Sequence, residues 1–452
     1  MGILRRCSLK LTAAFAAAVV LGLASPLEAQ VIQTTITPAA PPFNATRVFD
    51  PTPLPVLDRD NPVPVAPEDT PVATRQQPGY EQIGIREGSW IFLPSFMAGA
   101  FYDTNVFASN ILKRSDIAEV FEPSLRAHTL WEQHGIDLNL DAQQLVYDRN
   151  SGLNQTNASL RGNAWYDVTS DFAILSSFEI SHLNVGVGSL ASPAGAVQPT
   201  PYNYLSGDIS LRKEFNRLTT SVGFRTDSYS FQSTRDLNGD LISLDSLDGQ
   251  IYTLHGRVDY AVSPNLGWFA GAEGNDRNLR GTPGASLDSQ GYRVLSGVTL
   301  ALTNLISGEF GAGWVSQHFD DPLIGTIQGP SYRAIVRWSP TRLLDVNFKA
   351  EQIVTQTSQL TSAGVLADAV QVGADYELMR NVIVSATGAY ETDRFFGMVR
   401  KDHVIATDER IKYMVNRYGS IALYHQYTNR DSEIPTFSYD KHQVGLNVTA
   451  QF

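Results

Sequence analysis

The chain has almost no cysteine. Its single cysteine, Cys7, lies close to the start of a sequence of 452 residues, just before a short apolar run. We expect residues 1–29 to be a secretory signal peptide, because Arg5, Arg6 and Lys10 precede the apolar residues 11–24 and a possible cleavage site follows at Ala29. The mature chain would then lack cysteine, which excludes disulfide bonds and thiolate metal sites.

Long hydrophobic runs and excess positive charge are also missing. After residue 29 no apolar run approaches the roughly eighteen residues that a membrane-spanning helix needs, which excludes a helical membrane protein. The chain has 34 Lys and Arg against 46 Asp and Glu, for a formal net charge of −12. This acidity argues against a nucleic-acid partner.

Local signatures of catalysis are absent as well. The sequence has no GxSxG, no HExxH and no phosphate-binding glycine loop, so we expect no catalytic residues, no metal and no cofactor. Ser, His and Asp occur on many segments, which leaves a hydrolase open. Asp236, Asn238 and Asp240 have the spacing of a calcium loop, but Leu241 stands where such a loop needs glycine. An Asn-Gly turn is the simpler interpretation.

The composition divides the chain into three segments. Eleven of the 23 prolines lie between residues 31 and 79, a composition that favours an extended segment over regular structure. We therefore assign residues 1–29 to the signal peptide, residues 30–84 to a Pro-rich disordered periplasmic segment, and residues 85–452 to the folded part. The Pro-rich segment could serve as a tether or docking strip, or simply as a spacer.

The last eleven residues, HQVGLNVTAQF, alternate strictly between apolar and polar side chains. Val444, Leu446, Val448, Ala450 and Phe452 fall on one face of a strand, and the polar residues fall on the other. An edge strand of a soluble sheet could show the same alternation. The chain also ends on an aromatic residue, which is similar to the C-terminal insertion signal of bacterial outer-membrane barrels. By that resemblance, Phe452 would be read by the barrel-assembly machinery.

The same alternation repeats from Trp90 to the end, in runs separated by very short turns and longer polar loops in alternation. Most alternate runs end their apolar stripe on an aromatic residue beside a short turn, as Tyr166, Phe215, Tyr260, Trp338 and Tyr376 do, and the expected endings near Leu302 and Val415 are weaker. This pattern predicts an all-β fold, a closed antiparallel up-and-down transmembrane β-barrel of about 18 strands (16 possible), with both termini periplasmic. The strands around Tyr413 and Ala422 have the weakest apolar stripes.

The alternation of side chains between the two faces of a strand also predicts which residues face inward. Acidic and basic side chains are nearly balanced in this set, and so many charges would be too costly in a dry core. We therefore predict a polar, water-filled lumen without strong selectivity for one ion sign. The lumen-lining candidates are Arg126, Asp137, Asp141, Arg161, Asp208, Arg212, Arg257, Asp259, Arg293, Arg333, Arg337, Asp345, Lys349, Glu351, Asp375 and Glu377.

Residues 85–107, IREGSWIFLPSFMAGAFYDTNVF, resemble the opening of the Putative β-barrel porin 2 family of Gram-negative bacteria. The matching residues are Gly88, Pro94, Tyr102, Asp103 and Asn105, whereas Thr104 replaces a second aspartate of the family motif. The resemblance extends over roughly residues 80–452 and implies an outer-membrane location. Members of this family are often linked to exopolysaccharide systems, which implies a periplasmic polysaccharide-export protein and a polysaccharide as partners, beside outer-membrane lipid.

Three functions therefore stay open at this point. The first is a wide polar channel that exports a capsular or extracellular polysaccharide, the second is a general diffusion porin for small hydrophilic solutes, and the third is a structural barrel without an open pore. The two long loops, residues 188–201 and 234–248, could constrict the lumen or lie in solvent.

Overall fold

The computed structural model describes Val72, Arg75 and residues 77–131, 133–189, 192–281, 286–303, 305–322, 324–355 and 364–452. These residues belong to one compact unit, Ile36–Phe452. The predicted signal peptide and most of the Pro-rich segment lie outside the described residues. No helix in the described part of the chain is long and apolar enough to cross a membrane.

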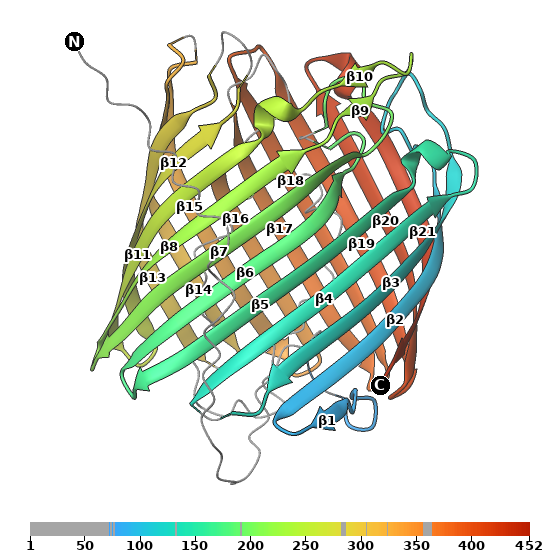
Figure 1. The fold of residues 1–452 in the computed structure, drawn as a ribbon. Helices are drawn as coiled ribbons and strands as arrows, with labels where there is room; N and C mark the ends of the chain where they lie inside the picture. Colours follow the sequence, from blue (N-terminus) through green and yellow to red (C-terminus); the bar gives the residue numbers. More distant parts are fainter. Residues whose placement is uncertain are drawn as a thin grey trace, which may run out of the picture. The chain divides into compact units, whose positions relative to one another are not determined.

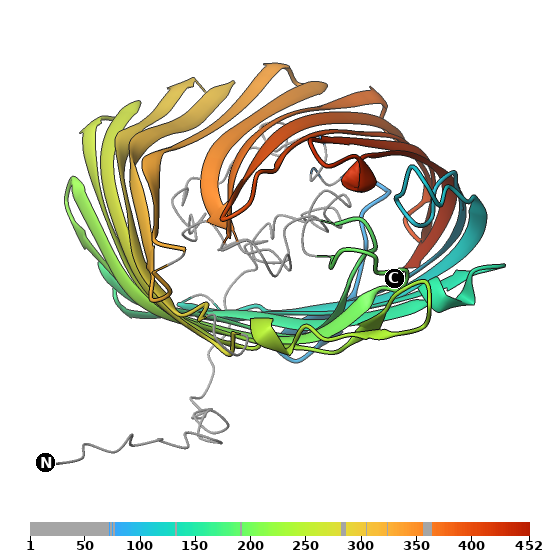
Figure 2. The ribbon, with the colours of Figure 1, turned by 90° about the horizontal axis from the view of Figure 1, so that it is seen from above.

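The described strands form a closed antiparallel barrel (Figures 1 and 2). The sheet has nineteen strands, of which β1 (Ile85–Glu87) is a short hairpin strand on β2, which leaves eighteen in the wall. These are β2 Trp90–Asp103, β3 Asp116–Thr129, β4 His134–Tyr147, β5 Gln155–Thr169, β6 Phe172–Val185, β7 Thr200–Phe215, β8 Leu218–Phe231, β11 Gly249–Ser263, β12 Leu266–Leu279, β13 Ser289–Thr303, β14 Ile306–Phe319, β15 Thr326–Thr341, β16 Leu344–Thr355, β17 Gly364–Met379, β18 Val382–Phe396, β19 Lys401–Asn416, β20 Gly419–Ser432 and β21 Tyr439–Gln451.

The strand count and the closed fold predicted from the sequence are confirmed, including the two strands with the weakest stripes, β19 and β20. Each strand pairs with its neighbours in chain order, and β2 pairs with β21 from Ser95↔Gln451 to Asp103↔Gln443. Closure pairs the first strand with the last, which a sheet in hydrocarbon requires because its backbone groups have no water to bond.

The two ends of the barrel differ in their connections. At one end, which we call the turn end, very short turns join the strands; only Asn216 and Arg217 separate β7 from β8. Asn216 has a φ of 55°, a left-handed conformation that asparagine tolerates better than most residues. Asp171, in the turn after β5, accepts hydrogen bonds from Lys213 and Thr169, and these bonds lower the pKa of its carboxyl group.

The other end, which we call the loop end, has longer connections. They include residues 104–115, 186–199 and 232–248, the last of which contains the small hairpin β9 (Thr234–Arg235) and β10 (Leu241–Ile242) and the 3-10 turn η4 (Asp245–Leu247). Two further 3-10 turns, η3 (Ser151–Leu153) and η5 (Pro435–Phe437), lie in other loops at this end. Both β2 and β21 have their outer termini at the turn end, as an even strand number demands.

The wall is not uniform, because β15 and β16 separate near the loop end. Their pairing stops at Arg333↔Glu351, although β15 starts at Thr326 and β16 continues to Thr355. Val354 of β16 and Leu366 of β17 take outward-facing positions of their strands. They nevertheless pack in one buried cluster with Val315 and Ile327, which lie on the inner face of β14 and β15. The loop-end parts of β16 and β17 therefore tuck inside the neighbouring wall, and Figure 2 shows the orange strands bending inward.

Candidate channel interior

The two faces of each strand differ sharply in chemistry. On β11, Leu254 is 61% exposed and Tyr260 42%, whereas His255, the neighbour of Leu254, is 8% exposed. Predicted aromatic stripe endings such as Tyr166, Phe215 and Trp338 are likewise exposed on the apolar face. In a closed barrel the apolar face is the outer one, because hydrocarbon surrounds the wall. The opposite face is the inner wall.

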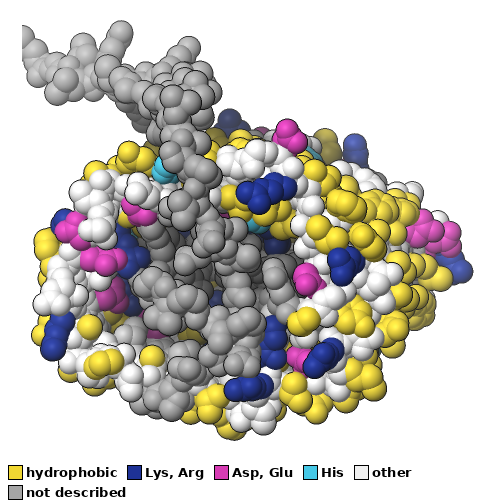
Figure 3. Space-filling model, turned by 90° about the horizontal axis from the view of Figure 1, so that it is seen from below, with side chains coloured by type: hydrophobic (Ala, Val, Ile, Leu, Met, Phe, Trp, Pro, Cys, Tyr) yellow, Lys and Arg dark blue, Asp and Glu magenta, His cyan; other side chains and the backbone are white. Residues whose placement is uncertain are grey.

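All sixteen predicted lumen-lining residues lie on the inner face of their strands. The register places each of them on the side opposite the exposed apolar residues; Leu254 pairs with Gly274, for example, while Arg257 pairs with Gly271 and Ser221. Figure 3, which views the turn end, shows charged side chains around the opening and hydrophobic ones over the outer flank. That these residues line a conducting path stays a prediction.

Most of these inner charges form ion pairs along the wall. Within the predicted set the pairs are Arg161–Asp141 at 3.3 Å, Arg257–Asp259 at 2.8 Å, Lys349–Glu351 at 2.8 Å and Arg337–Asp345 at 3.8 Å. Arg212 pairs with Glu214 at 3.0 Å, Asp208 with His255 at 2.8 Å, and Arg126 donates from Nε to Asn139 at 3.0 Å. Asp375 accepts from Ser385 at 2.6 Å, and Asp137 lies opposite His128 in the register.

A denser network lies on β11 to β16. Arg257 Nη2 reaches Glu309 Oε2 at 2.7 Å across the intervening strands, and Arg293 Nε contacts Glu273 at 2.8 Å. Arg257 also stacks on Phe269, with its Cζ 4.2 Å from the ring centroid. Arg333, 5% exposed, has an Nε without a hydrogen-bond partner among the described residues.

Loops fold inward at the loop end. Leu244 and Leu247 of the segment 232–248 are almost fully buried against Val185, Tyr202 and Phe231 on the inner wall. The carbonyl of Gly188 accepts hydrogen bonds from Arg430 Nη1 at 2.8 Å and from Tyr439 Oη at 3.3 Å. In the wall, β6 is separated from β20 by β5, β4, β3, β2 and β21. The loop that contains Gly188 follows β6, so it must cross the interior to reach Arg430 and Tyr439. Both long loops thus narrow this end.

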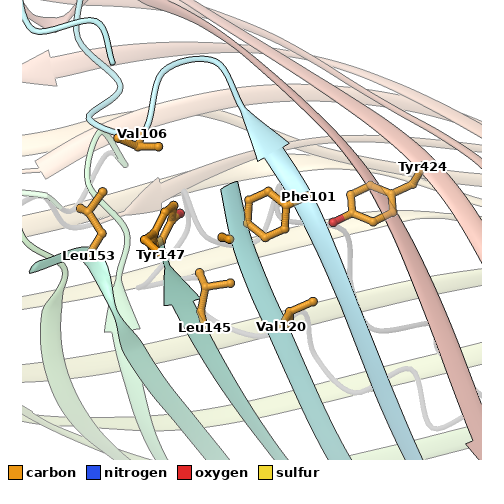
Figure 4. Packing of buried hydrophobic residues seen from close by; sticks show 8 residues of the cluster. Phe101, Val106, Val120, Leu145, Tyr147, Leu153 and Tyr424 are labelled. Atoms are coloured by element: carbon orange, nitrogen blue, oxygen red, sulfur yellow. The ribbon is translucent and has the colours of Figure 1, made fainter. Parts of the chain in front are cut away.

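A second inner cluster lies beside the first strand. Val106, in the loop after β2, packs with Phe101, Val120, Leu145 and Tyr424 on the inner face (Figure 4). Figure 4 shows these side chains reaching toward one another from both sides of the join between β2 and the last strands. The cluster therefore reinforces the wall where the chain closes on itself and narrows the same end of the lumen.

The turn end of the lumen holds part of the segment that precedes the barrel. The backbone N–H of Val72 donates to Asp345, Arg75 Nη1 lies 3.1 Å from Glu377 Oε2, and Gln77 Nε2 donates to the same oxygen at 2.8 Å. Val72 also packs against Ile383 and Met414. These wall residues all lie on the inner face near the turn end, so Val72, Arg75 and Gln77 lie against the inside of the opening.

The opening motif fastens the first strand to the last. Asp103 is fully buried, and its carboxylate accepts from Asn105 N at 2.8 Å, from Gln443 Nε2 at 2.8 Å and from Lys441 Nζ at 2.7 Å. Asn105 donates from Nδ2 to the carbonyl of Asp440 at 2.9 Å. The motif therefore closes the join between β2 and β21 at the loop end.

The other motif residues act at the same join or next to it. Thr104, the departure from the family motif, accepts at Oγ1 from His442 N at 2.9 Å. Pro94 lies one residue before pairing with β21 begins, and its carbonyl accepts from Phe452 N at 3.2 Å. Gly88 has a φ of 58° in the turn between β1 and β2, and Tyr102 is exposed on the outer face. Phe452 also stacks on Tyr418 with ring centroids 6.0 Å apart.

One group of Ser, His and Asp side chains lies on the inner wall, on β7 and β11, and its hydrogen bonds differ from those of a catalytic triad. Ser210 Oγ donates to Asp208 Oδ1 at 2.8 Å, and His255 Nε2 lies 2.8 Å from Asp208 Oδ2. The hydroxyl thus bonds the carboxylate and not the imidazole that would have to activate it. Asp236 Oδ1 accepts from the backbone N–H groups of Asn238 and Asp240, as in a turn. In the described part of the chain no group of three His, Cys, Asp or Glu residues could hold a metal ion.

The closed wall, the apolar outer face and the charged inner face define a porin-like barrel of the kind found in Gram-negative outer membranes. The chain belongs to the family described as Putative beta-barrel porin 2, whose model matches residues 77–452. The family assignment made from the opening motif is thereby confirmed. Its description is that of a channel family and not of an enzyme family.

Solved barrels are similar in fold at low sequence identity. OccK2 (OpdF) from Pseudomonas aeruginosa is 10% identical, with 80% of this chain and 98% of that chain covered and a TM-score of 0.46. OccAB3 from Acinetobacter baumannii is 11% identical, with 80% and 99% covered and a TM-score of 0.43. A mutant ferric enterobactin receptor from Pseudomonas aeruginosa is 7% identical, with 80% of each chain covered and a TM-score of 0.44. No curated protein matches the chain in sequence.

Proposed function

We propose that the protein is an outer-membrane diffusion channel for small hydrophilic solutes. The observation that carries this proposal is the chemistry of the inner wall, where charged and polar side chains from every part of the barrel replace the apolar core of a soluble protein. Such a surface binds water and presents few apolar patches to a passing solute. A barrel of sixteen to eighteen strands is wide enough for an aqueous path.

The folded loops set the size of the solute. Gly188 is held across the loop end by Arg430 and Tyr439, and Leu244 is buried against the inner wall. A polysaccharide chain would occupy the loop end throughout its export. The loops would therefore have to break their contacts with the wall before export could occur. They favour small solutes, whereas export of a polysaccharide with a periplasmic partner rests on the family resemblance alone.

In this proposal the turn end faces the periplasm. Short turns on that side and long loops on the outside are the usual arrangement in outer-membrane barrels, and a secreted chain with an even number of strands brings both termini to that side. The predicted signal peptide at residues 1–29 and the recognition of Phe452 by the assembly machinery belong to the same proposal. No cofactor, metal or nucleic acid enters it.

Conductance of the purified mature protein in planar bilayers tests the channel. We expect steady single-channel conductance without any added protein, and passage of small sugars but not of oligosaccharides in liposome swelling. Absence of conductance would contradict the proposal and favour a structural barrel. Passage of long oligosaccharides, or opening only with a periplasmic export protein, would favour polysaccharide export.

A substitution in the wall links the conductance to this lumen. Arg333→Gln removes one inner positive charge, whereas Lys213→Gln removes one from the outer face near the turn end. The Coulomb energy between a unit charge and an ion passing about 7 Å away is about 0.6 kcal/mol in water. This energy corresponds to a roughly threefold change in the local concentration of that ion. We expect Arg333→Gln to shift the reversal potential toward cation selectivity and Lys213→Gln to leave it unchanged. Equal reversal potentials for both variants would show that Arg333 does not line the path.

A further inference from the structure

Three ionisable side chains form a hydrogen-bonded row on the outer face of β19, β20 and β21. Glu409 Oε2 lies 2.7 Å from His425 Nδ1, and His425 Nε2 lies 3.2 Å from His442 Nδ1. Glu409 pairs in register with His425, and the three side chains are substantially exposed. His442 also stacks on Tyr427, with ring centroids 4.6 Å apart. We call this group the outer polar row.

Glu409 and His425 lie in the middle of the apolar band, and His442 lies nearer the loop end of β21. On β19, Glu409 stands between Ile405, 46% exposed, and Ile411, 48% exposed. Leu423 and Val444, 51% and 48% exposed, lie beside His425 on the same face. Other outward-facing charges on the described strands lie close to a strand end, as Glu119, Lys213 and Asp276 do. A carboxylate in this band faces hydrocarbon, which is costly, and such residues in membranes mark functional contacts.

The row also explains why β19 and β20 show the weakest apolar stripes in the sequence. Thr407 and Glu409 on β19, and His425 and Tyr427 on β20, take outward positions where other strands have leucine, isoleucine or valine. The polarity is therefore concentrated on one face of adjacent strands and is not scattered around the barrel.

Small residues lie beside the row. Ala386 and Gly388 of β18 pair in register with Glu409 and Thr407, and they lie on the same outer face. An added Cβ at Gly388 would meet no atom within 4 Å, so this strand leaves open space in front of it. Ala98 and Ala100 of β2 are further small residues on the other side of β21. Small residues allow two backbones to approach closely within a membrane, and polar groups between them then gain partners away from lipid.

We propose that the outer face of β18 to β21 is an interface that binds a second copy of this chain. The row contains both an acid and two imidazoles, so it is complementary to itself: in a two-fold arrangement the carboxylate of one copy can reach an imidazole of the other. Each copy thereby removes the other's polar row from hydrocarbon. This interface is independent of whether the lumen conducts, and β18 to β21 lie side by side on one flank of the barrel, as Figure 1 shows.

Disulfide cross-linking in intact outer membranes tests the interface. In a Cys7→Ser background the chain has no other cysteine. Thr407→Cys places a thiol beside the outer polar row, and Val222→Cys places one on the outer face of β8, on a distant part of the wall. We expect oxidation to yield a cross-linked dimer of this chain with Thr407→Cys and almost none with Val222→Cys. Equal yields, or a product that joins Thr407→Cys only to a different protein, would overturn the proposal.

A second pair of variants tests the row itself. Glu409→Leu with His425→Leu removes its polarity, and Thr226→Leu with Ser228→Leu makes the same kind of change on the outer face of β8. We expect light scattering in detergent to show a dimer that weakens by roughly tenfold in the first variant and is unchanged in the second. Heat-dependent gel mobility verifies that both are folded. A monomeric parent protein, or a dimer of full strength without Glu409 and His425, would refute the interface; if the first variant does not fold, the cross-linking result decides.

Discussion

Asp103 concentrates more polar contacts on one side chain than any neighbouring position of its strand. Its carboxylate is fully buried and bonds Asn105, Lys441 and Gln443, so it joins the first strand to the last. A buried carboxylate is stable only while its partners are in place, because desolvation of the charge is otherwise uncompensated. Together the contacts make closure at the loop end depend on Asp103.

Removal of this carboxylate should loosen the closure of the barrel. We expect Asp103→Ala to lower the free energy of unfolding by about 3 kcal/mol, since Lys441 then loses its buried partner. Denaturant titration of the purified barrel in micelles measures this loss. Asp276→Ala, which removes an exposed carboxylate near the loop end of β12, is the matched control and should change little. A comparable loss in both variants would contradict the role of Asp103.

The sequence identified the residues of the opening motif but not what they do. Alternation and turn chemistry placed Asp103 and Asn105 at the exit from the first strand, and this placement is local. Their partners, Lys441, Gln443 and Asp440, lie more than three hundred residues away, so only the closed barrel brings them together. The inner positions of the charged residues were predictable from the sequence. Side chains alternate between the two faces within each strand, so this assignment needs no distant partner.

At the scale of elements, the contacts of the segment before the barrel could not be predicted from the sequence. A Pro-rich composition indicates an extended chain but does not identify what the chain touches. Val72, Arg75 and Gln77 contact Asp345 and Glu377, wall residues that are separated from them by 273 to 302 positions. Such contacts depend on the shape of the opening and leave no local pattern.

These contacts predict that Val72, Arg75 and Gln77 limit conduction. We expect Arg75→Ala with Gln77→Ala to raise the open fraction or the mean conductance in planar bilayers. Each hydrogen bond to a charged group contributes about 1.5 kcal/mol, so loss of the pair should weaken docking by about a hundredfold. Arg86→Ala, an exposed residue of β1, is the control. Unchanged conductance in the double variant would show that the docked segment leaves the path open.

The separation of β15 from β16 is a second feature of the elements that no local pattern shows. Both strands have normal alternation, and the register alone reveals that residues 326–332 of β15 pair only with β14. The reason is the packing of Val354 and Leu366 under Ile327, which pulls β16 and β17 inward. Burial of apolar side chains thus outweighs continued strand pairing at this point.

This separation predicts uneven hydrogen exchange along the wall. We expect amides of residues 326–332 to exchange about tenfold faster than those of residues 306–312, which pair on both sides, because one net hydrogen bond contributes about 1.4 kcal/mol. Mass spectrometry of the barrel in detergent measures both segments. Equal protection would indicate that β15 and β16 are paired along their full length.

For the whole molecule, the strand order and closure followed from the sequence because every strand carries its own signal. The predicted number of about 18 strands equals the number in the wall of the barrel. The inward loops could not be predicted in the same way. Leu244 and Leu247 lie in a polar, Gly-containing segment, and their burial requires the inner faces of β6, β7 and β8 to be assembled first.

A substitution at Phe452 distinguishes recognition of the chain by the assembly machinery from the stability of the folded barrel. Phe452→Ala keeps the backbone N–H that donates to Pro94 but removes the ring that stacks on Tyr418. The lost ring contact contributes only about 1 kcal/mol, so refolding of the purified chain in micelles should be nearly normal. If the terminal ring is the signal read by the assembly machinery, the amount of folded barrel in the outer membrane should fall several-fold. Phe215→Ala, which removes another outer ring near the turn end, should leave it unchanged. Equal losses in cells and in refolding would show that the ring acts through stability alone.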